Sequence, residues 1–190
     1  ITKRSALRTN ILAAAVRWTF EGIEPVFAMP EVIPPGFGAL WIYIAIGALI
    51  GVLSVGVTRA VYLIEDGFEK LPIHWMWWPA IGGLVVGAVG LLSPETLGVG
   101  YENISAILNG KTPGMGLAVF ILLKFVSWSI ALGSGTSGGT LAPLLTIGGG
   151  LGALMGALAH QVLPAAAIDP RIAALVEEAA LFAGASRALL

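Results

Sequence analysis

The sequence predicts an all-α membrane protein, a multi-helix bundle of tilted, unequal and broken helices. Of its 190 residues 57% are hydrophobic and 11% are charged, whereas soluble domains carry about 25% charged residues. Asp, Glu, Lys and Arg are absent from residues 32–58, 71–94 and 125–168. A spanning helix needs about 20 mostly apolar residues, so each window can hold at least one. No run alternates apolar and polar residues as a barrel strand would.

The composition also excludes several classes of function. A net charge of −1 argues against a broadly basic surface, so we expect no nucleic-acid partner. Without cysteine, the chain has no disulfide, thiol nucleophile or cysteine-based metal site. His74 and His160 lack the spacing of paired ligands, and we therefore expect neither a metal nor a cofactor. Residues 1–190 form one domain, and its apolar end and its start at Ile1 without Met suggest an incomplete one.

The first third of the chain contains the clearest spanning segment. Ile1–Phe20 mixes basic and apolar residues and predicts a helix with a basic start that faces the cytoplasm, or an amphipathic helix at the membrane interface. Prolines between residues 25 and 35 then predict a loop. Phe37–Ile64 follows as a spanning helix, with Trp41 and Tyr43 at the start, where interfacial aromatic residues belong.

The remaining segments predict helices of unequal length, several of them too short to cross a bilayer. A cluster of three tryptophans precedes Ile81–Leu92, whose glycines would let helix backbones approach closely. Lys124 is the one charge inside an apolar helix; it is either a functional residue or one that snorkels or is paired for structural reasons. The other expected helices are Gly98–Leu108, Met115–Leu132, Leu141–Leu163 and Arg171–Leu181, and we expect a further helix to begin near Ala185.

The most informative segment is the glycine-rich break 133–139, which interrupts the longest charge-free window. Non-helical backbone at membrane depth must be buried in protein or line a watery cavity. Pro143 suits the first turn of a new helix, whose first N–H groups have no intrahelical partner. With the positive end of the helix dipole, the N–H groups of Gly139, Thr140 and Leu141 would form an anion site.

The glycines of the break also allow three other interpretations. The spacing of Gly133, Gly135 and Gly138 matches a dinucleotide-binding pattern, but no acidic residue follows until Asp169 and the flanks are membrane-like. A phosphate loop is excluded because no lysine follows the last glycine. Tight packing or a kink, the commonest use of glycine in membrane segments, is the strongest alternative.

The sequence around the break resembles the ClC family of voltage-gated chloride channels and chloride/proton antiporters. Gly139-Thr140-Leu141-Ala142-Pro143 is similar to the family's G-x-F-x-P signature, and Gly133-Ser134-Gly135 to the glycine- and serine-rich residues before it. The order of the flanking segments also matches, from Trp41 to Phe182-Ala183-Gly184-Ala185. The similarity covers most of the chain, is least evident over 1–35, and would place most of the chain within the second of two inverted repeats.

The resemblance implies an expected set of site residues. Backbone amides at the second and third signature positions, Thr140 and Leu141, would bind chloride together with that of Gly139. Leu141 departs from the family's Phe, which keeps the N–H but changes the apolar lining. The filter loop and helix start would comprise Gly133, Ser134, Gly135, Ser137, Gly138 and Pro143. The family's gating and proton glutamates would precede Ile1 and its pore tyrosine would follow Leu190, so channel and antiporter both stay open.

Chloride transport is therefore the predicted function, with chloride as the transported ion and protons as a possible second one. The resemblance implies a multi-pass protein of the plasma or inner membrane, in contact with lipid, and a homodimer when intact. A non-transporting membrane scaffold is the first alternative. An intramembrane enzyme is the second, but Ser134 and Ser137 have no His or Lys nearby in sequence, so no catalytic residues are predicted.

Overall fold

In the computed structural model, the described residues are 12–13, 15–20, 22, 27, 29–111 and 116–186, and they contain helices and no strand. Much of the expected first helix and Pro25 lie outside them. The longer helices are α2 (Phe37–Glu69), α3 (Trp78–Leu92), α4 (Tyr101–Leu108), α5 (Leu117–Gly133), α6 (Leu141–Val162) and α7 (Pro170–Ser186). Short 3₁₀ helices occur at η1 (Trp75–Trp77), η2 (Pro94–Thr96) and η3 (Pro164–Ala166).

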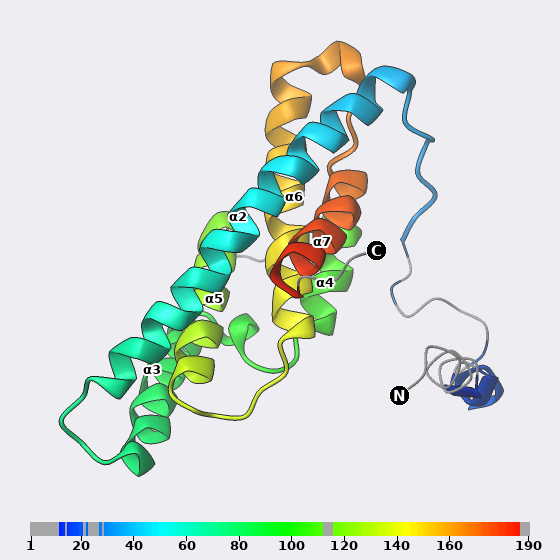
Figure 1. The fold of residues 1–190 in the computed structure, drawn as a ribbon. Helices are drawn as coiled ribbons and strands as arrows, with labels where there is room; N and C mark the ends of the chain where they lie inside the picture. Colours follow the sequence, from blue (N-terminus) through cyan, green and yellow to red (C-terminus); the bar gives the residue numbers. More distant parts are fainter. Residues whose placement is uncertain are drawn as a thin grey trace.

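Helix α2 is the longest element and runs obliquely along the bundle (Figure 1). It has 33 residues, well beyond the roughly 20 that cross a bilayer, and it begins at Phe37, directly after the proline-containing segment. Helices α6 and α7 lie beside its first part, while α5 lies beside its second part (Figure 1). By length and composition α2, α6 and the stretch Trp75–Leu92 could each cross a membrane.

The tightest helix packing is between α6 and α7. Glycines 148, 149, 150, 152 and 156 of α6 are all buried. A Cβ atom at Gly152 would lie 2.6 Å from the Ala173 carbonyl oxygen of α7, and one at Gly156 would lie 2.9 Å from the Pro170 Cα. These distances are shorter than van der Waals contact, so the two backbones can meet only because α6 has no side chains there. This close approach positions the first turn of α6 against the rest of the bundle.

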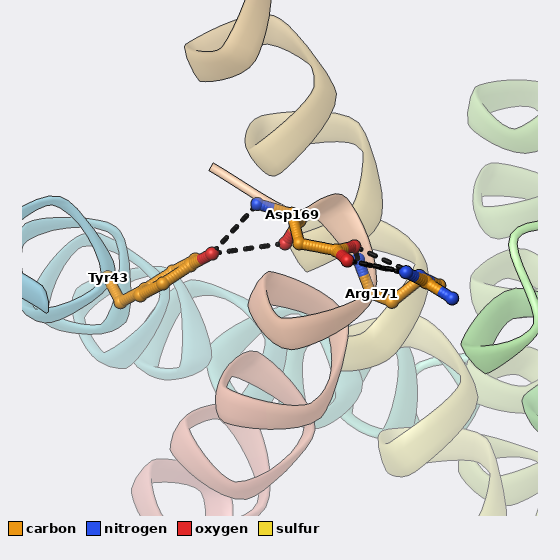
Figure 2. Close-up of polar contacts among 3 residues, drawn as sticks. All are labelled: Tyr43, Asp169 and Arg171. Carbon is orange, nitrogen blue, oxygen red and sulfur yellow. Dashed lines mark hydrogen bonds and ion pairs between the residues drawn. The ribbon is translucent and has the colours of Figure 1, made fainter. Parts of the chain in front are cut away.

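A second contact attaches α2 to the start of α7. The buried Tyr43 hydroxyl accepts a hydrogen bond from the Asp169 N–H (2.9 Å) and donates one to the Asp169 carbonyl (3.3 Å) (Figure 2). The Asp169 carboxylate in turn accepts bonds from the backbone N–H and the side chain of Arg171. Hydrogen bonds from the Arg171 side chain lower the pKa of the Asp169 carboxyl. This stabilisation is present above the ordinary Asp range and is lost as acid protonates the carboxylate.

The expected elements agree with the structure except at the end of the chain. The all-α prediction is confirmed, and the six predicted helices from residue 37 onward all occur, with ends shifted by a few residues. The expectation that a new helix begins near Ala185 is wrong, because α7 continues without interruption to Ser186. Its packing against α6 and α2 sustains the helix beyond the amphipathic stretch from which we predicted its extent.

We expect Gly152→Ala to destabilise the protein, by about 1–3 kcal/mol, because the added methyl group meets the α7 backbone. The control is Gly87→Ala on α3, where no atom lies within 4 Å of the new Cβ and alanine is the better helix former. Thermal unfolding in detergent measures both variants. Equal stability of the two would contradict close packing of α6 on α7.

We also expect Tyr43→Phe to lower the free energy of unfolding by about 1–3 kcal/mol, since the partly buried N–H and carbonyl of Asp169 each lose a hydrogen bond. Tyr62→Phe, at an exposed position of the same helix, should have little effect. Denaturant titration measures the free energy of unfolding of both variants. If Tyr43→Phe leaves it unchanged, the Tyr43–Asp169 hydrogen bonds do not stabilise the attachment of α2 to α7.

Candidate anion-binding site

The break between α5 and α6 is built by glycines with different roles. Gly133, expected in the break, is the last residue of α5 and is buried. A Cβ atom there would lie 2.7 Å from the Ile64 side chain and 3.1 Å from the Glu65 nitrogen. Gly135 has φ +79°, which side-chain-bearing residues rarely adopt. The packing interpretation therefore applies to Gly133, and Gly135 makes the turn.

The hydroxyl of Ser134, a predicted filter residue, is engaged within the break. Ser134 is buried, and its Oγ donates to the Ala131 carbonyl (2.7 Å) and lies 3.2 Å from Thr136 Oγ1. The opposing residue is Gly82 of α3, where an added Cβ would lie 2.7 Å from the Ser134 Cβ. Ser134 thus fixes the turn against α3, which requires glycine at position 82.

Residues 135–141, which follow Ser134, are exposed to solvent, and some of their backbone N–H groups are unpaired within the described residues. Residues 135–141 are exposed, and nothing lies within 4 Å of a Cβ at Gly138 or Gly139. Within the described residues, the N–H groups of Gly139, Thr140 and Leu141 have no hydrogen-bond acceptor; the backbone bonding of α6 starts with the Leu144 N–H and the Thr140 carbonyl (3.2 Å). Pro143 has no N–H to lose. These donors converge at the positive end of a 22-residue helix.

A cleft borders the same helix start on one side. Its volume is about 340 Å³, and α2, α5, α6 and α7 all contribute to its lining, with Thr140 among the lining residues. The other polar side chains that line it are Thr58, Tyr62 and Glu65. A carboxylate repels an anion, so Glu65 disfavours chloride inside the cleft. The open face of residues 135–141 is the better approach to the donors.

Lys124, the intramembrane charge singled out from the sequence, has a structural partner. Its side chain is 3% exposed, and its Nζ donates to the carbonyls of Thr96 (2.7 Å) and Gly98 (3.1 Å). The ammonium therefore fastens the loop between η2 and α4 to α5. A cavity of about 150 Å³ beside it is also lined by Pro143, so a positive charge lies near the first turn of α6.

The remaining titratable residues that the structure describes do not form a site with the break. The His74 Nδ1 accepts a hydrogen bond from the Met76 N–H, and His160 lies in the last turn of α6. No group of three His, Asp or Glu residues suited to a metal occurs in the part of the chain that the structure describes. Sequence reasoning missed Glu177 and Glu178, which are buried in α7. Their adjacency gave no signal, because neighbours in an amphipathic helix are expected to point in different directions.

Comparison with known proteins decides the family. The family model described as "Voltage gated chloride channel" matches residues 4–190. The chain belongs to this family. It is 31% identical to the H(+)/Cl(−) exchange transporter ClcA of Vibrio campbellii over 99% of this chain and 41% of that protein. The chloride channel protein CLC-e of Arabidopsis thaliana is 31% identical over 82% of this chain and 23% of that protein.

Solved structures of the family share the fold. A slow cyanobacterial Cl⁻/H⁺ antiporter has a TM-score of 0.76 at 24% identity, over 91% of this chain and 41% of that one. A CLC-type fluoride/proton antiporter has a TM-score of 0.73 at 21% identity, over 93% and 43%. Membership in this family, together with the apolar helices, makes this an integral membrane chain. It spans about two fifths of the length of the ClcA relatives.

We expect Lys124→Met to destabilise the protein by about 1–3 kcal/mol, because the buried Thr96 carbonyl and the partly buried Gly98 carbonyl lose their donor. Lys111→Met, at an exposed position after α4, is the matched control for loss of a charge. Unfolding in detergent compares the two variants. A Lys124→Met protein as stable as the control would show that the ammonium does not hold the loop.

Proposed function

We propose that this chain supplies one wall of a transmembrane chloride pathway and binds the anion through backbone N–H groups at the start of α6. The observation that carries the proposal is the set of free donors at Gly139, Thr140 and Leu141 on an exposed turn. Membership in the chloride channel family supports chloride as the ligand. The names of the ClcA relatives, which are H(+)/Cl(−) exchange transporters, support proton exchange in the intact protein.

Backbone donors suit transport better than a fixed cation at the same point. Partial charges and hydrogen bonds stabilise a halide, yet leave it free to depart, and conduction requires both entry and exit. Lys124 adds positive potential from behind the first turn, but its ammonium is held by carbonyl groups. This ammonium thus serves to hold the structure, while the exposed turn 135–141 offers the anion only dipoles.

Leu141 gives the site an apolar rim. Its side chain is 48% exposed, and because the proposed contact is its N–H, a change of side chain alters anion preference and rate more than binding itself. We further propose a homodimer in the plasma or inner membrane, in which this chain acts as a transporter part and not as an enzyme or a passive scaffold. Within the described residues, Ser134 is bonded to Ala131 and Thr136, and it has no catalytic base.

The amide proposal is tested by removing one donor. In the intact transporter that contains this chain, Thr140→Pro deletes the Thr140 N–H and should weaken chloride binding about tenfold or more, since hydrogen bonds to charged groups contribute about 1.5–3 kcal/mol. Gly139, which precedes it, tolerates the restriction that proline imposes on its neighbour. Chloride binding by calorimetry and chloride flux from proteoliposomes are the measurements.

Thr140→Val is the matched control, because it removes the hydroxyl and keeps the N–H. It should bind and transport chloride like the parent protein. If Thr140→Pro folds and retains parental binding, the backbone site is wrong. If Thr140→Val loses as much as Thr140→Pro, the hydroxyl and not the amide is the ligand.

A further inference from the structure

Two adjacent carboxylic side chains are buried in the middle of α7. Glu177 is 0% exposed and Glu178 is 6% exposed. Both Glu177 oxygens and the Oε1 of Glu178 have no hydrogen-bond partner among the described residues. Transfer of an ionised carboxylate out of water without a partner is very costly, whereas the neutral acid costs far less. This pair therefore differs from the solvated carboxylates at the ends of α2 and α4.

Glycines of the neighbouring helices make the space for both side chains. The Glu177 oxygens lie 3.7 Å from a Cβ built at Gly47 of α2, and its Cβ lies 2.6 Å from one built at Gly152 of α6. The Glu178 Oε1 lies 2.6 Å from a Cβ built at Gly149, one turn before Gly152 on the same helix. The carboxyl groups of α7 thus lie in the tightest interface of the bundle, against α6, whose first turn carries the proposed anion donors.

No described cation neutralises the pair. On α6, the only titratable side chain is that of His160, in the last turn and within electrostatic range of Asp169. On α2, Tyr43 is bonded to Asp169, and Arg59 is exposed and lies 12 residues beyond Gly47, or about 18 Å along the helix. The remaining ionisable residues of α2 and α4 are exposed: Tyr62, Glu65, Asp66, Glu69, Tyr101 and Glu102.

We propose that Glu177 and Glu178 form a proton-binding site between α2, α6 and α7, in which the ligand is the proton and both side chains are held as neutral acids. A metal ion is a poor alternative, because no third acidic or histidine ligand joins the pair within the described residues. Deprotonation places negative charge where α7 meets the glycines of α6, and it loosens this interface. The observations behind this proposal, the burial of the two side chains and their lack of hydrogen-bond partners among the described residues, do not involve the anion turn or chloride transport.

The proposal fixes the sign of a pH effect. An unfolded glutamate releases its proton near pH 4.3, while the buried acid keeps it to higher pH. The folded state therefore binds more protons than the unfolded state, and stability falls as pH rises. Asp169 acts in the opposite direction and only in more acidic solution. The range from about pH 5 to about pH 8 consequently isolates the glutamates from Asp169.

The test measures the melting temperature of the intact protein in detergent across this pH range. The parent should lose several degrees as pH rises. Glu177→Gln, a neutral isostere, should abolish most of this loss, and Glu178→Gln a smaller part. Glu69→Gln, at the exposed end of α2, is the matched control and should keep the parental slope. Every variant keeps His160, so any contribution of this residue cancels from the differences between slopes.

Infrared spectroscopy gives a second measurement, whose first result comes from the parent protein alone. At neutral pH the parent should show the carbonyl band of a protonated carboxylic acid, and Glu177→Gln should reduce it. Absence of that band in the parent overturns the proposal, as does an equal pH slope in Glu177→Gln and the parent. A melting temperature that rises with Na⁺, Mg²⁺ or Ca²⁺ in the parent but not in Glu177→Gln would also overturn it, in favour of a cation site. None of these outcomes depends on Thr140 or on chloride flux.

Discussion

The side-chain-free face of α6 is the constraint on which the rest of the bundle depends. Where Gly152 and Gly156 oppose Ala173 and Pro170, the α6 and α7 backbones approach more closely than any side chain would allow. In lipid, where hydrocarbon outside the protein is as apolar as the helices, such close contact is a main source of association. Because α7 is also attached to α2 through Tyr43, this one face sets the positions of three helices.

The position of the proposed anion donors follows from that packing. Helix α6 is held along its length, with Ala142 and Leu144 of its first turn already buried, while the preceding segment 135–141 stays exposed. A helix start at membrane depth would otherwise leave N–H groups unpaired in hydrocarbon, which the bilayer does not tolerate. Such a turn is stable only if water or an ion accepts hydrogen bonds from these N–H groups. The packing of α6 against the bundle therefore holds its start in place, while the N–H groups at that start keep no partner within the described residues.

Most of the fold was predictable from the sequence because charge-free windows and proline positions act locally. The prolines before Phe37 and the Gly133–Gly139 break marked helix ends within a few residues. The roles of individual polar residues were not predictable, since they depend on contacts distant in sequence. Lys124 pairs with carbonyls 26 and 28 residues away, and Tyr43 with Asp169, 126 residues away. The end of α7 was misjudged for the same reason.

Lys124 and Glu177 show two ways in which an ionisable side chain is accommodated in an apolar interior. Lys124 reaches backbone carbonyls, whose lone pairs satisfy an ammonium without a counter-ion. Glu177 cannot use that solution, because carbonyls and ionised carboxylates are both acceptors; the described surroundings give its oxygens no donor. A carboxyl group in this position can become compatible with its surroundings by acquiring a proton, which removes the charge and supplies a donor. Nearby carbonyl acceptors thus satisfy the buried lysine, whereas the lack of donors around Glu177 within the described residues favours its neutral form.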